Sequence, residues 1–389
     1  MVLTGAAILA SAIWIYLVWF HGRYWRADQF LSAVTPARAR WPEVVAVIPA
    51  RNEAEVIGEA VSAHLESSYP GKFQVVVVDD HSQDGTAETA RTAARAHAKS
   101  PVGLTVVPGQ PLPQGWSGKL WAVHQGIQDA VRRAPKAEYF LLTDADIRQG
   151  PEVLARLVTK AEGGKFALVS LMAKLDARNF WAQLLVPAFV YFFQKLYPFP
   201  WVNEPANATA GAAGGCMLIR RSALEAAGGV EAVKGELIDD CALARMLKEK
   251  SAEGRIWLGL TREVVSLRDN RRLGAIWNMV ARTAYTQLRR SPLLLAGTVA
   301  GMALTYLTPP LLALGWPLHG NTPAALLGAA AWGMMTWSYA PTLRLYHRPA
   351  WTGLDLPLAA LLYTAMTVTS AARHWKGKGG QWKGRVYPA

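Results

Sequence analysis

The chain has 389 residues, 51% of them hydrophobic, and its 41 Lys+Arg against 28 Asp+Glu give a formal net charge of +13. This apolar fraction is high for so many cations and indicates a membrane protein with a water-exposed part, whose charge favours phosphate-bearing or anionic-lipid partners. Nucleic acid is disfavoured because the sequence has no zinc-finger, RNP or basic-zipper pattern, and two distant cysteines, Cys216 and Cys241, exclude a disulfide framework and fit a reducing compartment.

The N-terminal stretch predicts a membrane anchor. Residues 2–20 carry no charge and are about long enough to cross a bilayer. Basic residues come after this stretch, at Arg23 and Arg26, whereas a signal peptide carries them in front of its apolar run. We therefore expect an uncleaved anchor over residues 1–22, with the domain after it on the cytoplasmic face of a bacterial-type inner membrane.

Residues 42–151 alternate between continuous Val/Ile/Leu runs and segments with apolar residues at helical spacing. Such runs are typical of parallel strands that are buried on both faces. The pattern predicts an α/β, Rossmann-like fold, a mostly parallel sheet with helices on both faces. The expected strands are 44–49, 74–80, 104–109, 139–144 and 167–171, and the expected helices are 53–67, 86–98 and 118–133.

Acidic residues stand at the carboxyl ends of two expected strands, which is where open α/β sheets bind ligands. Asp79 and Asp80 end one apolar run, and Asp144 and Asp146 come after another. An Asp at such an end can accept a hydrogen bond from a nucleobase N–H. Residues i and i+2 of an extended segment point to one side, so Asp144 and Asp146 could together hold Mg²⁺ or Mn²⁺ on substrate phosphates.

Two common nucleotide-binding motifs are absent. The first expected strand is followed by PARNEAEVIG, which has no glycine before Gly58 and therefore excludes the G-x-G-x-x-G fingerprint. The segment GWSGKL resembles a phosphate loop, but Pro113 and Leu120 stand where that loop needs a glycine and a Ser or Thr. Lys119 stays a candidate ligand for nucleotide phosphates, the alternative being a solvated lysine at a helix start.

Two polar clusters and an aromatic segment complete the set of candidate site and interface segments. Asp239 and Asp240 precede an amphipathic stretch, where one acid suits an N-cap and the second could act as general base on a hydroxyl. Gln287 and Arg290, in QLRR, either contact lipid headgroups or stabilise a leaving diphosphate. Residues 181–201, rich in aromatic residues and interrupted by prolines, predict a helix at the membrane interface, with an ordinary core helix as the alternative.

Three late stretches, 292–317, 322–343 and 351–372, have spanning length. Three full crossings after a cytoplasmic domain would leave the basic tail, residues 373–389, on the outside, against the positive-inside rule. We therefore expect one of these membrane segments to be re-entrant or a hairpin. The first choice is 292–317, because Pro309 and Pro310 interrupt it.

These segments, in this order, resemble family 2 glycosyltransferases with the GT-A fold over residues 42–291. The motifs that carry the resemblance are IPARNE, VVDDHSQDGT, the GK at 118–119, DAD, GGCMLIRRSAL, IDD and QLRR. The anchor, the late apolar stretches and the tail WKGKGGQWKGR make the chain most similar to hopene-associated glycosyltransferases, which in turn resemble ceramide glucosyltransferase.

The resemblance implies a role for each motif. Asp80 would bind the nucleobase, with uracil expected, and Asp144 and Asp146 would hold Mg²⁺ or Mn²⁺ on the donor diphosphate. Asp240 would be the catalytic base, with Asp239 beside it. The nucleotide-binding positions, taken together, are Pro49, Arg51, Glu53, Asp80, Lys119, Asp144, Gln287 and Arg290.

The resemblance thus implies a membrane-bound, inverting enzyme that moves one sugar from a nucleotide sugar to a lipid hydroxyl, on a hopanoid or ceramide-like acceptor. The family's Q-x-x-R-W motif lacks its Trp here, because Ser291 stands in that place, and this departure argues against processive synthesis. One alternative is a polyprenyl-phosphate sugar transferase or short polysaccharide synthase, and with a phosphate acceptor Asp240 would be dispensable. The other is a non-catalytic membrane protein that binds a partner or lipid.

Overall fold

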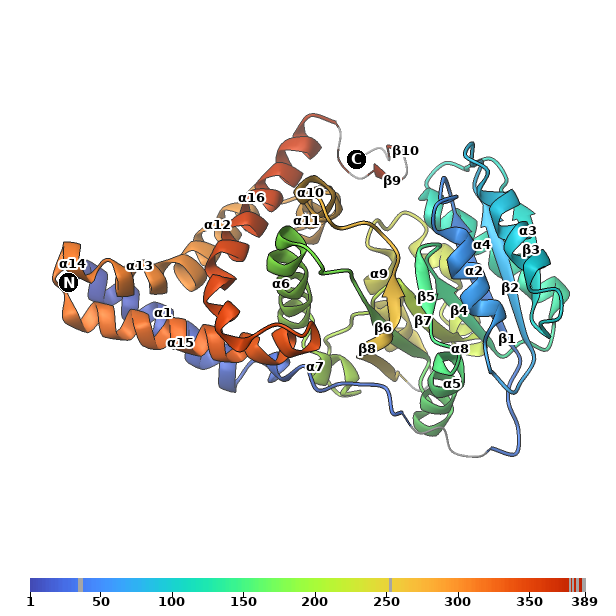
Figure 1. The fold of residues 1–389 in the computed structure, drawn as a ribbon, viewed down its shortest axis with the longest axis horizontal. Helices are drawn as coiled ribbons and strands as arrows, with labels where there is room; N and C mark the ends of the chain where they lie inside the picture. The colour runs from blue at the N-terminus through green and yellow to red at the C-terminus, as the bar shows by residue number, and fades with distance from the viewer. Residues whose placement is uncertain (34–37, 252–253, 378, 380, 383–384, 387–389) are drawn as a thin grey trace.

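The computed structural model describes residues 1–389 except 34–37, 252–253, 378, 380, 383–384 and 387–389. Figure 1 shows an α/β domain and, projecting from one side of it, a group of long helices with the N-terminus at its far tip. In the described part of the chain the main sheet has eight strands, in the order β3-β2-β1-β4-β7-β6-β8-β5. They are β1 (Val44–Ala50), β2 (Phe73–Asp79), β3 (Gly103–Pro108), β4 (Tyr139–Thr143), β5 (Ile147–Gln149), β6 (Leu168–Lys174), β7 (Cys216–Arg220) and β8 (Ile256–Ser266).

The first half of the sheet confirms the predicted α/β fold. β2 pairs in parallel with β3 and β1, and β1 pairs in parallel with β4, which brings the carboxyl ends of these strands to one edge. Every residue of β1 is buried, which explains why its sequence shows no polar alternation. β7 runs antiparallel to both β4 and β6, so the complete sheet is mixed, a feature that the strand pattern did not predict.

Helices cover both faces of the sheet, as predicted. α4 packs on one face of the parallel strands, and α2 and α5 pack on the other. At Gly126 of α4, a Cβ atom would lie 2.4 Å from the Val47 side chain, so only glycine lets this helix approach β1 so closely. The helices of this domain are α2 (Ile57–Leu65), α3 (Thr86–Ala96), α4 (Gly118–Arg133), α5 (Val153–Gly164), α8 (Arg221–Ala226), η2 (Val230–Val233) and α9 (Asp239–Lys250).

The helix expected over 53–67 begins only at Ile57, because the residues before it form a loop that interlocks with the turn after β2. Asn52 takes a positive φ of 51°. The backbone amides of residues 52–54 donate to side-chain oxygens of residues 82–86, at 2.8 to 3.0 Å. These hydrogen bonds fix both loops at the carboxyl edge of β1 and β2.

The projecting part is a helical bundle. α1 (Val2–Trp19) runs from the tip to the α/β domain. The chain later runs back out to the tip through α12 (Pro292–Met302), the π-helical turn η3 (Ala303–Leu307) and α13 (Thr308–Leu314), and it reaches α14 (Trp316–His319) there. α15 (Thr322–Leu345) then returns toward the domain. At the tip, Asn321 Nδ2 donates to Thr4 Oγ1 at 3.0 Å. At the other end, the rings of Trp25 and Trp337 lie 4.3 Å apart. α15 therefore runs beside α1 from the tip to the domain.

The structure does not fold 292–317 into a hairpin by itself. This segment forms a single bent helical path toward the tip, and α15 forms the returning half of the hairpin. Pro309 and Pro310 lie in the first turn of α13, after the wider π-helical turn, where the missing proline N–H groups do least harm. By length and composition, three stretches of the described residues could cross a membrane, namely Val2–Trp19, Pro292–Leu314 and Ala350–Trp375.

Further helices connect the bundle to the α/β domain (Figure 1). The predicted interfacial segment 181–201 forms α6 and α7, which are separated near Pro198. The connecting elements are η1 (Tyr24–Arg26), α6 (Phe180–Leu196), α7 (Phe199–Asn203), α10 (Leu273–Ala281), α11 (Ala284–Gln287), η4 (Ala350–Asp355) and α16 (Leu356–Trp375). After α16, β9 (Gln381–Trp382) pairs antiparallel with β10 (Arg385–Val386).

Candidate active site

A cavity of about 610 Å³ lies where the carboxyl edge of the sheet meets the connecting helices. One end is polar and is formed by strand ends, the start of α4 and the start of α9. The other end is apolar and is formed by connecting helices. The predicted site residues that line the cavity are Pro49, Glu53, Lys119, Asp144, Asp146, Asp239, Asp240 and Gln287.

Asp144 and Asp146 lie just after β4, and each is paired with a cation of the chain. Lys119 Nζ, at the start of α4, lies 2.9 Å from Asp144 Oδ1. Asp146 Oδ2 accepts a hydrogen bond from Ser266 Oγ at 2.9 Å and lies 3.3 Å from Arg268 Nε. The two cations remove the repulsion that would otherwise oppose placing two carboxylates side by side.

Lys119 also connects these acids to the acid pair of α9. Its Nζ lies 3.1 Å from Asp239 Oδ2, as well as close to Asp144. Burial disfavours the ammonium form, but the attraction of the two carboxylates outweighs burial and raises the pKa of Lys119. The polar end of the cavity therefore holds a permanent cation between its two groups of acids.

Asp240 is held in a fixed orientation in the first turn of α9. The backbone amide of Gly214 donates to its Oδ2 at 2.8 Å, and the amide of Cys241 donates to its Oδ1 at 2.8 Å. Burial and the neighbouring Asp239 carboxylate raise the pKa of Asp240 to about 6, against the lowering effect of Lys119. At neutral pH the group is a carboxylate whose proton affinity suits a general base.

Asp80 and Arg51 form a separate pair beside the cavity, at the carboxyl ends of β2 and β1, and neither lines the cavity in the described structure. Asp80 is 1% exposed. The Arg51 guanidinium donates to the Asp80 carbonyl oxygen at 2.5 Å and lies 3.6 Å from its Oδ2. Behind them, a Cβ atom at Gly109 would lie 3.1 Å from Asp80 Cα, so glycine allows the next loop to support this backbone closely.

The structure separates the two predicted residues of the QLRR motif. Gln287 lines the cavity, and its Nε2 donates to Tyr197 Oη at 2.8 Å. Arg290 is exposed, has a positive φ of 56° and lies outside the cavity lining. Arg282 and Arg268 line the cavity instead. The sequence did not indicate them, because nothing in their spacing from an expected strand or helix end distinguishes them from neighbouring arginines.

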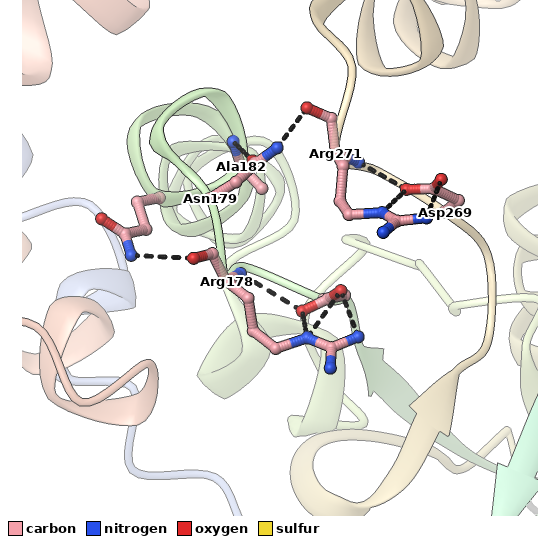
Figure 2. A network of polar contacts seen from close by, with 7 residues as sticks. Arg178, Asn179, Ala182, Asp269 and Arg271 are labelled. Carbon is pink, nitrogen blue, oxygen red and sulfur yellow. Dashed lines mark hydrogen bonds and ion pairs between the residues drawn. The ribbon is translucent and has the colours of Figure 1, made fainter.

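Figure 2 shows how the loop that carries Arg268 is fastened to α6. Asn179 caps α6, since its Oδ1 accepts from the Ala182 amide at 3.0 Å, and its Nδ2 donates to the Arg271 carbonyl oxygen. An Arg–Asp pair stiffens each side of this contact. The pairs are Arg178 with Asp176 and Arg271 with Asp269. The loop beside Asp146 and the helix that walls the apolar arm are therefore positioned together.

The apolar arm of the cavity is walled by α6, α10, α12 and α16. Aromatic and aliphatic side chains dominate this wall, and such a surface favours a hydrocarbon over a polar ligand. Its residues include Phe189, Phe192, Phe193, Leu196, Met279, Val280, Leu288, Met302, Tyr363, Thr364 and Thr367. α6, α10 and α16 connect the α/β domain to the bundle, and α12 belongs to the bundle, so the arm leads from the acids toward the bundle helices.

The family model of glycosyl transferase family 21 matches residues 2–389, which is nearly the whole chain. This chain belongs to glycosyl transferase family 21. The prediction of a glycosyltransferase is thereby confirmed, and the family shown is family 21, whereas the motifs resembled family 2.

Three known proteins are similar to this chain, one in sequence over a short stretch and two in structure. Glycosyltransferase AglE of Haloferax volcanii is 46% identical over 57 residues, which cover 14% of this family 21 chain and 19% of that protein, so the match spans about a fifth of the relative's length. The mannosyltransferase PcManGT from Pyrobaculum calidifontis, in complex with GDP-Man and Mn²⁺, superposes with a TM-score of 0.56 at 22% identity, over 96% of this chain and 99% of that one. This likeness supports the predicted fold class. Glucosyl-3-phosphoglycerate synthase of Mycobacterium tuberculosis gives a TM-score of 0.40 at 18% identity, over 64% of this chain and 80% of that one.

Proposed function

We propose that this family 21 glycosyltransferase moves one sugar from a nucleotide sugar to a hydroxyl of a membrane lipid, with inversion at the sugar carbon. The observation that carries the proposal is a single cavity that joins the acids after β4 and on α9 to the apolar arm between the connecting helices. The polar end suits a nucleoside diphosphate, and the arm suits the hydrocarbon of a hopanoid or ceramide-like lipid.

The donor would occupy the polar end. Asp80 lies at the end of β2, where its carboxylate could accept a nucleobase N–H, with uracil expected, while Arg51 fixes its backbone. Lys119 and Arg268 each neutralise an acid at this end. Both are placed to bind diphosphate oxygens, and Arg282 is a further candidate because it lines the cavity where Arg290 does not.

Asp144 and Asp146 fit a divalent cation, Mg²⁺ or Mn²⁺. Their carboxylate oxygens are the ligands that these hard cations prefer, and both residues line the cavity. Among the described residues no group of three or more His, Cys, Asp or Glu side chains is arranged to hold a metal, so the donor and water would complete the coordination. A bound cation would neutralise the leaving diphosphate, and the Mn²⁺ in the PcManGT complex with GDP-Man supports this assignment.

Asp240 would accept the proton of the acceptor hydroxyl. The amides of Gly214 and Cys241 fix both of its oxygens, so no reorientation is needed when the hydroxyl arrives. Asp239 is paired with Lys119 and would influence Asp240 through its negative charge, without itself contacting the acceptor hydroxyl. A single displacement with the base on the acceptor side and the diphosphate on the opposite side gives inversion.

The test is a transfer assay with the full chain in detergent. Labelled UDP- and GDP-sugars are offered with Mn²⁺ or Mg²⁺ and an extract of bacterial membrane lipids. We expect label in an organic-soluble product that withstands mild acid, with the anomeric configuration inverted by NMR. An acid-labile glycosyl phosphate would instead establish a polyprenyl-phosphate acceptor, and a lengthening polymer would establish a polysaccharide synthase. Either product would contradict transfer to a lipid hydroxyl.

The pH profile of kcat depends on the raised pKa of Asp240. A carboxyl group with a pKa of about 6 takes up a proton at higher pH than an ordinary Asp, and the protonated form cannot act as a base. We expect activity to fall about tenfold per pH unit below about pH 6. In Asp239→Asn the acid limb should move to lower pH, because the neighbouring negative charge that raises the pKa is removed. An acid limb unmoved by this substitution would contradict the role of Asp240.

A further inference from the structure

We propose that α16 does not cross the membrane but lies along the leaflet next to the α/β domain. One of its faces would be in contact with the acyl chains of that leaflet, and the side turned toward α6, α10 and α11 forms a wall of the acceptor cavity. The part that concerns the acceptor rests on the proposed function, whereas the placement of the helix does not.

α16 and the turn before it carry an apolar stripe that nothing in the described structure covers. Its residues are spaced by three, four or seven positions, so they share one helical face, and each is between 43% and 60% exposed. They are Leu354, Leu358, Leu361, Val368 and Trp375. The bundle helices that precede α16 also expose large apolar side chains, such as Leu293, Leu311 and Leu326. This shared exposure of apolar surface indicates hydrocarbon as the occupant of the stripe.

The other side of α16 is tied along its length to helices that connect to the α/β domain. Tyr363 Oη donates to the Leu185 carbonyl oxygen of α6 at 2.8 Å. Ser370 Oγ accepts from the Tyr285 amide of α11 at 3.0 Å. Arg373 donates to Asn278 Oδ1 of α10 at 2.8 Å. From residue 363 to 373 the helix advances about 15 Å without leaving the domain side.

The path of the chain before α16 removes the need for another crossing. α12, η3 and α13 run out to the tip, and α15 returns beside α1. The residue after α15, Tyr346, is already back at the domain, where its ring centroid lies 5.7 Å from Lys174 Nζ of β6. If α16 then crossed, Arg373 and Lys376 would be carried to the face opposite the domain. A helix that stays in the near leaflet keeps these cations on the domain side, as the positive-inside rule requires.

α16 is also the partition between that leaflet and the cavity. Tyr363 and Thr367 line the cavity from the side of α16 turned away from the exposed stripe of Leu361 and Val368, and Thr364 lines it at the margin of the stripe. α16 therefore stands between the acyl chains and most of the apolar arm, and the cavity reaches the margin of the stripe at Thr364. We infer that the acceptor lipid reaches Asp240 from the leaflet that α16 lies in.

Cysteine labelling tests the placement of α16 without any need for activity. Both native cysteines are buried, so single cysteines can be added to the full chain as it stands. We expect a membrane-impermeant maleimide to label Leu318→Cys, at the tip, in intact cells. Lys376→Cys, just after α16, and the matched control Glu225→Cys, in the α/β domain, should label only after permeabilisation. Labelling of Lys376→Cys together with Leu318→Cys in intact cells would overturn the proposal.

Depth measurements provide a second, independent readout. Nitroxide labels at Leu358→Cys and Val368→Cys lie on the same stripe, about 15 Å apart along the axis of α16. In liposomes of bacterial phospholipids, a helix in the leaflet places both labels at nearly equal depth, whereas a crossing helix separates their depths by most of that distance. Unequal depths, or labels without lipid contact because a second copy of the chain covers the stripe, would overturn the proposal. A lack of sugar transfer with equal depths would count against the proposed function alone.

Discussion

Asp240→Asn is expected to lower kcat for sugar transfer by about 10²–10⁴-fold, the usual contribution of a general base. The substitution keeps the size of the side chain but removes the group that accepts the proton from the acceptor hydroxyl. Donor binding should change by less than about twofold, because the other donor-site residues keep their contacts. The measurements are steady-state kinetics for transfer and calorimetry for the binding of UDP and GDP.

The matched control is Asp239→Asn on the adjacent residue. Asp239 pairs with Lys119 and is not the group proposed to accept the proton. Removing its charge should therefore reduce kcat much less than the loss of Asp240. In Asp240→Asn the amide group would face one of the two backbone N–H donors, so a destabilisation of about 1 kcal/mol is expected and is checked by thermal unfolding. Full transfer activity in a folded Asp240→Asn enzyme would exclude the base role and favour a phosphate acceptor, which needs no base.

Asp144→Asn is expected to weaken metal-dependent nucleotide binding by at least about tenfold. The residue is one of two carboxylates placed to hold a divalent cation and is also the partner of Lys119 at 2.9 Å. Removing its charge both weakens the metal ligand set and leaves Lys119 paired with Asp239. Calorimetric titration of UDP and then GDP, with Mn²⁺ or Mg²⁺ and again with EDTA, measures the effect.

EDTA should abolish the metal-dependent binding of nucleotide to the native enzyme. In the presence of EDTA, Asp144→Asn should cause no further loss of binding. Glu225→Gln, an exposed acid on α8, is the control for a nonspecific charge effect and should bind as the native enzyme does. The assigned roles of Asp80, Asp144 and Asp146 would be lost if the folded native protein bound neither nucleotide. That result would revive the non-catalytic alternative.

Local patterns were enough to predict the parallel half of the sheet. The Val-rich runs of β1 and β2 are buried on both sides, and the acids after β2 and β4 stand at the edge where such sheets bind ligands, so local sequence indicated both the strands and the position of the site. Motifs of this kind also led to the glycosyltransferase assignment. The acids at 144, 146, 239 and 240 were predicted to act together, and the structure gathers all four around one cavity.

The features that local patterns missed depend on contacts between distant segments. Arg268 lies against Asp146 although more than a hundred residues separate them in the sequence. Arg282, at the end of α10, lines the cavity, whereas Arg290, where the backbone turns with positive φ after α11, does not. The spacing of residues along the sequence does not predict contacts between such distant segments. Likewise, hydropathy places Pro292–Leu314 and Ala350–Trp375 among the segments that could cross a membrane and leaves out α15, because it depends on composition and not on direction. Only the packing of α15 beside α1, and of α16 against α6, α10 and α11, decides which of them runs with the bundle, because hydrogen bonds and side-chain contacts fix a helix's direction and its own hydrophobicity does not.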